Sequence, residues 1–311
     1  MKIVRFPIII FSYNRPDHLK KTLKALIQST TIKHHKIFFF NDGPKNYKDK
    51  KKIEAIKKLI NKYKKLIKFK KINFNKKNVG LFNNIIINVT SVLKKNKAAI
   101  ILEDDILSSD NSLEFINFFL NKEKKSNKIG SVSGYSYLDD FKIKQKFQLY
   151  LSKRHSSWAW GTWSHVWFKF KSDYLDKKNS NAFKLKTPGF ESLGDDMEMM
   201  LWAQKNNLIN SWSVLFNYFC FKEKYKCLQP RYSLVQNIGL DNSGTHSSLR
   251  SFFKKEKKIK YKFKFLKNNI YFFSRVVDTF IKKSNKESIK LRFLYIIKKF
   301  KSYINFKLIN I

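Results

Sequence analysis

The sequence is poor in acidic residues and in arginine. Its 311 residues include 23 Asp and Glu against 65 Lys and Arg, a formal net charge of +42. Only 7 of the basic residues are arginines, and 58 are lysines. Lysine, asparagine, isoleucine and phenylalanine are abundant together, so codon bias of an AT-rich coding sequence explains part of the charge. Because arginine is preferred for bidentate recognition of bases and phosphates, its scarcity argues against a nucleic-acid partner.

Cysteine, glycine and proline are scarce as well. The two cysteines, Cys220 and Cys227, are too few for a disulfide framework, and no cluster of His and Cys completes a zinc site. We therefore expect reduced thiols in a cytoplasmic protein. The apolar run of residues 7–11 is too short for a signal peptide, and no run reaches the roughly 18–20 residues that span a bilayer. Contact with a membrane is therefore expected at its surface only.

The first hundred residues alternate between short apolar runs and amphipathic segments. Buried strands are expected over residues 7–12, 36–40, 67–74 and 98–103, and helices over about 17–27, 53–63 and 79–93. A β-α-β-α-β-α-β order is typical of a doubly wound, mostly parallel sheet flanked by helices. The predicted fold class is therefore α/β.

The pattern is less regular after residue 105. We expect a helix from Ser112, strands over 129–133, 148–152 and 213–221, a helix after Asp196, and a loop over 229–248. Residues 154–163 read as neither a clean helix nor a clean strand. The sequence predicts a main domain over residues 1–248.

Residues 249–311 form a basic, aromatic-rich tail. The tail carries 3 acidic residues among many lysines, and residues 289–304 show a helical apolar face. We expect a helical appendage outside the core. Basic amphipathic segments favour anionic membrane surfaces, and the alternative is a terminal helix packed on the domain.

The most unusual stretch is a buried strand that ends in three consecutive acids, Glu103, Asp104 and Asp105. Ligands of open α/β sheets bind at the carboxyl ends of strands, where these side chains are expected. Adjacent carboxylates repel one another and raise each other's pKa unless a cation joins them. Mg²⁺ or Mn²⁺ carrying a phosphorylated ligand suits such hard oxygen ligands. The alternative is an acidic turn that caps the next helix.

Two other turns are expected at the same edge of the sheet. The first strand leads into Ser12, Tyr13, Asn14 and Arg15 and not into a Gly-x-Gly-x-x-Gly fingerprint, which argues against a Rossmann dinucleotide site. A polar turn there can receive a nucleotide through its side chains and the following helix N-terminus. Asp42 ends the second strand and can accept a hydrogen bond from a base or sugar. Its alternative role is to form a turn with Gly43.

Taken in order, these motifs resemble the GT-A glycosyltransferases. The Phe-Ser-Tyr-Asn-Arg-Pro turn, the Asn-Asp-Gly turn and the Asn78-Val79-Gly80 element precede an acidic triplet similar to the Asp-x-Asp element of that superfamily. The triplet most resembles the Glu-Asp-Asp form of N-acetylglucosaminyltransferase I and its bacterial, family 2 type relatives. The resemblance covers roughly residues 5–245, and the loop from Gly239 to His246 departs from it.

The resemblance implies a GT-A fold and a set of roles in the donor site. Asp105 would ligate Mn²⁺ or Mg²⁺, Glu103 would bind the ribose, and Asp104 would assist through water or the sugar. The nucleotide-sugar donor would also contact Ser12, Asn14, Arg15, Asp42 and Gly80.

Downstream motifs imply the acceptor side. Trp160, Gly161 and Trp163 resemble the acceptor-binding segment of the family. Asp196, with Asp195 as the alternate, would be the catalytic base, although Asp195 can equally be a helix N-cap. Two further residues, Arg231 and His246, are candidate phosphate ligands.

The implied activity is metal-dependent transfer of a sugar to an acceptor hydroxyl, with inversion. A saccharide or lipid-linked saccharide acceptor would place the enzyme in surface polysaccharide or glycolipid synthesis, on the inner face of the cell membrane. The alternatives are a non-catalytic basic protein that binds nucleic acid or lipid, and a metal-dependent nucleotidyltransferase.

Overall fold

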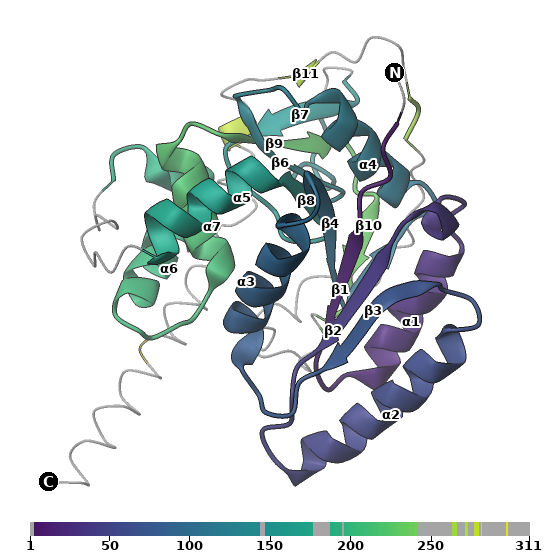
Figure 1. Cartoon of the computed structure of the whole chain (residues 1–311). Helices are drawn as coiled ribbons and strands as arrows, with labels where there is room; N and C mark the ends of the chain where they lie inside the picture. Colours follow the sequence, from purple (N-terminus) through teal and green to yellow (C-terminus); the bar gives the residue numbers. More distant parts are fainter. Residues whose placement is uncertain are drawn as a thin grey trace, which may run out of the picture.

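A nine-stranded sheet runs through the molecule with helices on its two faces (Figure 1). The computed structural model describes residues 3–143, 147–176, 187–194, 196–239, 241, 263–265, 271–272, 277–279, 281 and 297. The strand order is β11-β7-β9-β6-β8-β4-β1-β2-β3, and a second sheet pairs β10 with β5. Five of the eight neighbouring pairs in the large sheet are parallel, which confirms the predicted mostly parallel α/β architecture.

The first half follows the predicted alternation closely. The strands β1, β2, β3 and β4 are parallel, with Ile10 opposite Leu102 and Ser12 opposite Asn41. Because the strands run in one direction, their polar last residues meet at one edge of the sheet. The elements are β1 (Ile8–Ser12), α1 (Pro16–Ile27), η1 (Ile32–His34), β2 (Ile37–Asn41), α2 (Tyr47–Tyr63), β3 (Phe69–Phe74), α3 (Gly80–Leu93) and β4 (Ala98–Glu103).

The second half adds antiparallel strands and a helical layer. The strand β8 lies between β4 and β6 and is antiparallel to both. The elements are β5 (Ile106–Ser108), α4 (Ser112–Lys122), β6 (Ile129–Ser133), β7 (Leu149–Ser152), β8 (Trp160–Trp163), α5 (Ser164–Phe170), η2 (Lys171–Asp176), η4 (Phe190–Leu193), α6 (Asp196–Lys205), α7 (Trp212–Lys222), β9 (Lys226–Pro230), β10 (Val235–Asn237) and β11 (Tyr271–Phe272).

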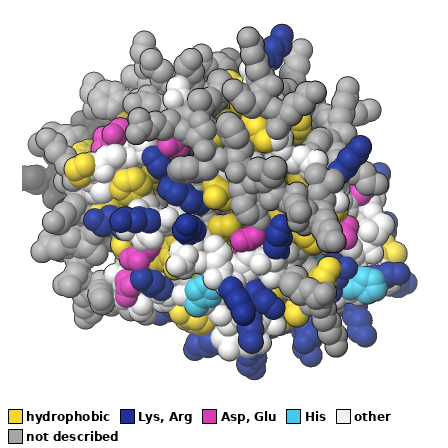
Figure 2. All heavy atoms as spheres, turned by 90° about the horizontal axis from the view of Figure 1, so that it is seen from above, with side chains coloured by type: hydrophobic (Ala, Val, Ile, Leu, Met, Phe, Trp, Pro, Cys, Tyr) yellow, Lys and Arg dark blue, Asp and Glu magenta, His cyan; other side chains and the backbone are white. Residues whose placement is uncertain are grey.

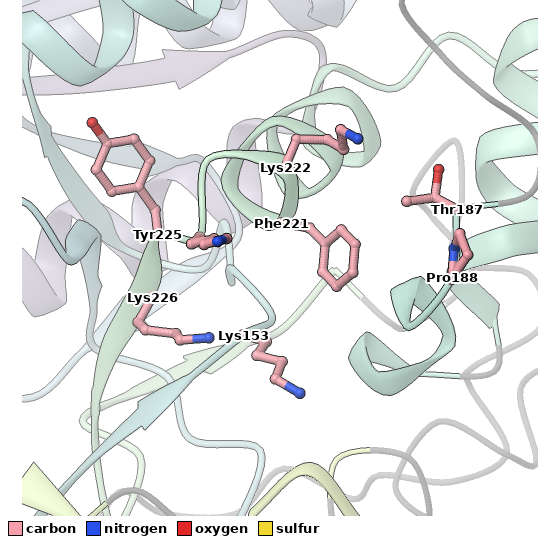
Figure 3. Close-up of a pocket in the computed structure, with 8 residues that line it drawn as sticks. Lys153, Thr187, Pro188, Phe221, Lys222, Tyr225 and Lys226 are labelled. Atoms are coloured by element: carbon pink, nitrogen blue, oxygen red, sulfur yellow. The ribbon is translucent and has the colours of Figure 1, made fainter.

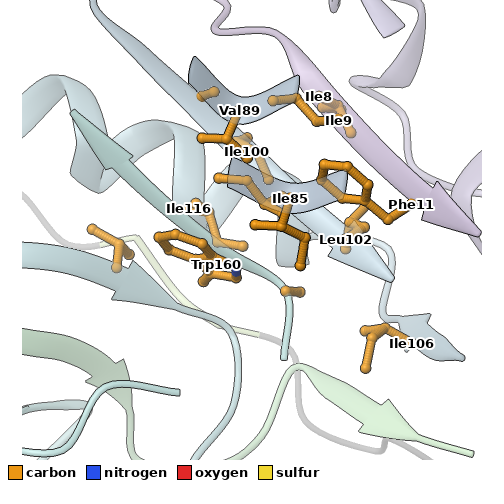
Figure 4. Close-up of a cluster of buried hydrophobic side chains, with 14 of the residues drawn as sticks. Ile8, Ile9, Phe11, Ile85, Val89, Ile100, Leu102, Ile106, Ile116 and Trp160 are labelled. Carbon is orange, nitrogen blue, oxygen red and sulfur yellow. The ribbon is translucent and has the colours of Figure 1, made fainter. Parts of the chain in front are cut away.

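The core is built around the central strands β1 and β4 (Figure 4). Ile9 of β1 and Ile100 of β4 are 0% exposed, as are Ile85 of α3 and Ile116 of α4, which cover opposite faces of the sheet. Burying each such side chain stabilises the fold by about 1.5–3 kcal/mol. The apolar runs therefore fix the sheet, and the polar residues that end them are placed at its edge.

The segment 213–221 is a helix, so the prediction of a strand there is wrong. The helix α7 begins at Trp212, and Ser211 caps it by accepting a hydrogen bond from the Val214 backbone N–H at 3.4 Å. Every residue from Val214 to Cys220 is buried. A helix that is apolar on all sides shows no 3.6-residue period, and its aromatic residues favour a strand on propensity alone.

Residues 263, 271–272, 277 and 281 of the tail pack on the main domain, which favours the alternative of a packed tail over an appendage outside the core. Residues 271–272 form β11, which joins the large sheet beside β7. Phe263 packs against Phe115 of α4 with ring centroids 4.8 Å apart. Val277 and Ile281 are buried with Leu138 and Tyr150 in a second apolar cluster. Alternating Lys and aromatic residues are thus compatible with a tail that supplies core side chains.

Basic side chains lie in separate groups on the face shown in Figure 2. In Figure 2 the Lys and Arg side chains form several separate groups with acidic side chains among them, and no single basic stripe is visible on this face. A protein that tracks a nucleic-acid backbone is expected to show such a stripe. In the described part of the chain, no helix combines the length and apolar character needed to cross a membrane.

A buried histidine predicts acid sensitivity. His155 is 2% exposed, lies against Trp160 and Phe216, and its Nδ1 is 3.0 Å from Ser131 Oγ. Burial lowers its pKa to about 3 from 6.5. Below pH 6.5 the unfolded chain therefore binds a proton that the folded protein excludes, so stability falls as pH falls. We expect a loss of about 2 kcal/mol from this residue between pH 6.5 and 5.

Urea unfolding of wild type and His155→Asn at pH 7.5 and pH 5 tests this expectation. The variant should lose less stability than wild type on acidification. The exposed His34 provides the matched control, because His34→Asn should leave the wild-type pH dependence unchanged. Equal acid-induced losses in wild type and His155→Asn would contradict the prediction.

Candidate functional site

The acids of the triplet lie at the edge where β1, β2 and β4 end. Glu103 is the last residue of β4, and Asp104 and Asp105 form the turn into β5. Asp104 and Asp105 are 3% and 7% exposed, and Glu103 is half-buried. Burial, followed by the charge of Asp105, raises the pKa of Glu103 to about 8. Burial also raises the pKa of Asp105.

Arg15 supplies a positive charge to the triplet from the loop after β1. Its Nη2 contacts Asp104 Oδ1 and lies 2.9 Å from Asp105 Oδ2. Burial disfavours the guanidinium charge, but Asp104 and Asp105 outweigh it and raise the pKa of Arg15. From the sequence we expected a cation to join these carboxylates. In the structure the guanidinium of Arg15, 89 residues before Asp104, supplies that positive charge. Arg15 therefore holds the acids together, and its predicted phosphate contact stays a prediction.

Asp104 and Asp105 differ in how many of their oxygens are engaged. Asp104 accepts hydrogen bonds from Ser12 Oγ and Tyr13 N, each at 3.2 Å, besides the contact with Arg15. Asp105 Oδ1 is buried and has no hydrogen-bond partner. An orphaned buried carboxylate oxygen is costly unless a ligand completes it. Among the described residues, no three His, Cys, Asp or Glu side chains form a metal-ligand set. Asp105 fits Mg²⁺ or Mn²⁺ as one protein ligand, because these ions keep water and phosphate ligands.

The carboxylate of Asp42 organises the loop before α3. It accepts hydrogen bonds from the backbone N–H groups of Gly43, Val79 and Gly80 at 2.8, 3.0 and 2.9 Å, and from Asn78 Nδ2 at 3.0 Å. Gly80 has φ +80°, a conformation that favours glycine. Turn formation, the alternative role of Asp42, is therefore present in the structure. The donor contacts of Asp42 and Gly80 stay predictions.

Asp49 is a site residue that the sequence analysis missed. From the first turn of α2 it accepts hydrogen bonds from Tyr13 Oη at 2.6 Å and from Asn14 Nδ2 at 2.7 Å. Burial would raise the pKa of Asp49, but these bonds outweigh it and lower the pKa. Asp49 thereby fixes the polar turn after β1. Its position 35 residues from Asn14 left no local pattern by which to find it.

The segment after β10 lies directly over the acids. Ile238 N donates to Asp105 O at 2.9 Å. A Cβ on Gly239 would lie 2.1 Å from Asp105 Oδ2 and 2.7 Å from Arg15 Nη1, so only glycine fits without a shift. His18 Nε2 is 3.1 Å from Asp241 Oδ2. The loop that departs from the family resemblance therefore begins in contact with the candidate metal ligand.

The predicted acceptor residues of β8 are core residues. Trp160 is 0% exposed and Trp163 is 2% exposed, and Trp163 Nε1 donates to Leu120 O at 3.0 Å. A Cβ on Gly161 would meet Leu120 and Ile116 of α4 within 3 Å, so Gly161 allows the helix to approach the strand. Their burial between β4 and β6 is incompatible with direct contact to an acceptor, which corrects that prediction.

Aromatic side chains other than Trp160 and Trp163 lie at the edge of the sheet where β4 ends. Trp158 lies two residues before the start of β8, and because β8 is antiparallel to β4, this position is at the edge of the sheet where β4 ends. Trp158 is half-buried and contacts Tyr135 with ring centroids 4.4 Å apart, and Tyr135 contacts Tyr137 at 5.1 Å. We call Trp158, Tyr135 and Tyr137 the aromatic row. It lies at the same edge of the sheet as the acidic triplet.

The aromatic row leads to Asp196. Arg154 lies 5.4 Å from the Tyr137 ring and binds both oxygens of Asp196, at 2.6 and 2.9 Å. Asp196 is 0% exposed and begins α6. A carboxylate enclosed in this way is not accessible to an acceptor hydroxyl, so its contacts indicate a structural role. Asp195, the alternate base, lies outside the described residues.

Of the two candidate phosphate ligands, only Arg231 lies among the described residues. Arg231 is 4% exposed, and its guanidinium donates to the carbonyls of Leu138 and Phe141, the latter at 2.6 Å. These bonds hold the loop after β6, which argues against phosphate binding by Arg231. His246 lies outside the described residues.

No protein-family model matches the chain, and no curated protein matches it in sequence. Among solved structures, TarS 1-349 from S. aureus is similar over 76% of this chain and 62% of that chain, with 10% identity and a TM-score of 0.44. The complex of TarS 1-349 with UDP-GlcNAc is similar over 73% of this chain and 56% of that chain, with 10% identity and a TM-score of 0.44. GalNAc-T7 with UDP, GalNAc and Mn²⁺ is similar over 76% of this chain and 44% of that chain, with 13% identity and a TM-score of 0.46. The chain spans 62% or less of each of these structures. At these values the functional assignment rests on the residues of the site.

Proposed function

We propose that the protein is a glycosyltransferase that moves a sugar from a nucleotide-sugar donor to an acceptor hydroxyl. The observation that carries the proposal is the edge of the sheet itself. Asp105, with an orphaned buried oxygen, follows β4, and Trp158 of the aromatic row precedes β8 at the same edge of the sheet. We infer that a donor diphosphate and an acceptor sugar bind at this shared edge.

The donor would bind between the turn after β1 and the acidic triplet. Asp105 would ligate Mn²⁺ or Mg²⁺, which would neutralise the diphosphate leaving group as a Lewis acid. Glu103, the last residue of β4, would hydrogen-bond the ribose. Arg15, already beside Asp105, is placed to contact the diphosphate. Asp49 would keep Tyr13 and Asn14 oriented toward the nucleoside.

The acceptor would bind along the aromatic row. Trp158 and Tyr135 keep part of their surface exposed, and flat aromatic faces pack well on sugar rings. They take the role first expected of Trp160 and Trp163. The acceptor oxygen would form a bond to the anomeric carbon as the bond from that carbon to the diphosphate oxygen breaks. The hydroxyl proton would pass to a carboxylate, for which we propose Asp195, and attack opposite the leaving group would invert the anomeric centre.

The proposed setting is the synthesis of a surface polysaccharide or glycolipid. The acceptor would be a saccharide or a lipid-linked saccharide, and the enzyme would work in the cytoplasm, peripherally on the inner face of the cell membrane. The many lysines would favour that anionic surface.

A thermal-shift screen of nucleoside diphosphates, with and without Mn²⁺, tests the proposal. We expect one nucleoside diphosphate to raise the Tm, and to do so more strongly with metal, because ligands that bind the folded state stabilise it. A non-catalytic basic protein would instead respond to polyanions in a strongly salt-dependent way. The absence of any nucleotide response, with or without metal, would refute the proposal.

Substitution of Gly239 should impair this site without unfolding the protein. In Gly239→Ala the new methyl group must displace the Asp105 carboxylate or the Arg15 guanidinium, both of them flexible side-chain ends. We expect a loss of transfer activity of roughly 10–100-fold, because displacement of about 1 Å in a catalytic group can cost that much. The control is Gly134→Ala, whose Cβ would meet only the Val235 side chain closely, at 3.1 Å. Activity of Gly239→Ala equal to that of Gly134→Ala would contradict the prediction.

A further inference from the structure

A second binding site is suggested by a cavity lined with lysines. The cavity has a volume of about 330 Å³. Four lysines line it, and none of the described residues that line it is acidic. The lining residues are Lys153, Thr187, Pro188, Phe221, Lys222, Lys224, Tyr225 and Lys226. Figure 3 shows the ring of Phe221 between Thr187 and Pro188 on one side and Lys153 and Lys226 on the other.

The cavity lies at the sheet edge opposite the acidic triplet. The strand β9 is parallel to β6, and β8 is antiparallel to both β6 and β4, so β9 and β4 run in the same direction. Lys226 begins β9, whereas Glu103 ends β4. A ligand of this cavity is therefore not the donor diphosphate of the proposed transferase site.

The backbone places the lysines before any ligand arrives. Lys224 has φ +61°, in a tight turn between α7 and β9 that is closed by a hydrogen bond from Tyr225 N to Cys220 O at 2.8 Å. Lys153 Nζ is 2.8 Å from Asp278 Oδ2 and 3.4 Å from Ser192 Oγ. Asp278 thus offsets one positive charge, and the nearby Glu223 is paired with Lys169 at 2.6 Å. Among the described residues, the four lining lysines outnumber these two carboxylates, Asp278 and Glu223.

Gathering these lysines costs energy that an anion would recover. Burial, followed by the charge of Lys153, lowers the pKa of Lys226. Ammonium groups bind phosphate as point charges and require no fixed geometry. The rings of Phe221 and Tyr225 add an apolar surface beside the charges. A volume of this size suits a single headgroup, whereas a nucleic-acid strand requires a continuous groove.

We propose that this cavity binds the phosphate group of a small phosphate ester, either the headgroup of an anionic phospholipid or a soluble phosphate monoester. The proposal does not depend on the transferase activity. If the ester is a lipid, the cavity determines which edge of the sheet faces the membrane.

Binding by two double variants of equal net charge tests the proposal. Lys222→Gln/Lys226→Gln changes the cavity, and Lys52→Gln/Lys58→Gln changes two exposed lysines of α2. The probes are phosphatidylcholine vesicles containing phosphatidylglycerol, pure phosphatidylcholine vesicles, and soluble glycerol phosphate. We expect the cavity variant to bind a phosphate probe roughly 30-fold more weakly than the α2 variant, since each lysine near an anionic headgroup contributes about a factor of five. A charge-retaining variant, Lys222→Arg/Lys226→Arg, should keep binding and excludes a folding defect.

The binding results distinguish a lipid headgroup from a soluble phosphate ester, and they show when the proposal is wrong. Cavity-dependent binding of glycerol phosphate assigns a soluble ester, and cavity-dependent binding of the phosphatidylglycerol vesicles alone assigns a lipid headgroup. Equal loss in the cavity and α2 variants would overturn the proposal, because only net charge would then matter. Failure of the wild type to bind either phosphate probe would overturn it as well. A third result would also overturn the proposal: binding of a short single-stranded oligonucleotide that depends more strongly on the two cavity lysines than binding of either phosphate probe does.

Discussion

Replacing Asp105 with asparagine is expected to reduce sugar transfer by about three orders of magnitude while leaving the fold intact. The amide keeps the size of the side chain but removes the charge from the one orphaned carboxylate oxygen of the triplet. Loss of a ligand that stabilises leaving-group charge typically costs about 100–1,000-fold in rate or more. Asp105→Asn weakens the contact of Asp105 Oδ2 with Arg15 but also removes a carboxylate whose charge burial disfavours, so we expect the free energy of unfolding to fall less than in Asp104→Asn.

Asp104→Asn is the matched control for that prediction, since it makes the same chemical change one residue earlier. Asp104 is engaged with Ser12, Tyr13 and Arg15. We expect Asp104→Asn to destabilise the fold by about 2–3 kcal/mol, because a buried charge-assisted bond to Arg15 is weakened. Thermal unfolding and a transfer assay on both variants test whether Asp104 mainly affects stability and Asp105 mainly affects transfer. If Asp104→Asn abolishes Mn²⁺-dependent transfer and Asp105→Asn does not, the assignment of the direct metal ligand is reversed.

The sheet and the placement of the triplet were predictable because they depend on local patterns. Residues 98–103 are uniformly apolar up to Glu103, and such a run in a β-α series indicates a buried parallel strand that ends in acids. The contacts of the triplet were not predictable. Arg15 reaches Asp104 across 89 residues, and no period or spacing records such a pairing.

The aromatic residues were misassigned for a different reason. Trp160 and Trp158 are separated by one position, and in composition they are equivalent. Trp160 is paired inside β8 and is 0% exposed, whereas Trp158 precedes the strand, before Ala159 with φ +46°, and is half-buried. Positions i and i+2 of a strand share a face, so the difference depends on where β8 begins, which the sequence pattern does not show. The same limit applies to Asp196, whose burial depends on Arg154 from a distant strand end.

The second large effect is expected at the pair Asp195 and Asp196, where the two substitutions should separate activity from stability. Asp196 binds Arg154 through both oxygens and is 0% exposed. Asp196→Asn leaves the buried guanidinium uncompensated, so we expect a loss of about 3–5 kcal/mol in the free energy of unfolding. Asp195→Asn should keep wild-type stability but lower transfer by about 100–10,000-fold, the range for loss of a general base.

A double substitution of the ion pair distinguishes a positioning role of Asp196 from a catalytic one. In Arg154→Met/Asp196→Leu both charges are removed, and well-packed apolar side chains can replace a buried ion pair with little loss of stability. If Asp196 only fixes the start of α6, this variant should recover most of the stability and much of the transfer activity lost in Asp196→Asn. If Asp196 is the base, transfer stays abolished although the protein is stable, and Asp195→Asn remains active. The pH profile of kcat is an independent test. Loss of the general base removes the fall in kcat at low pH, whereas a loss of stability alone does not.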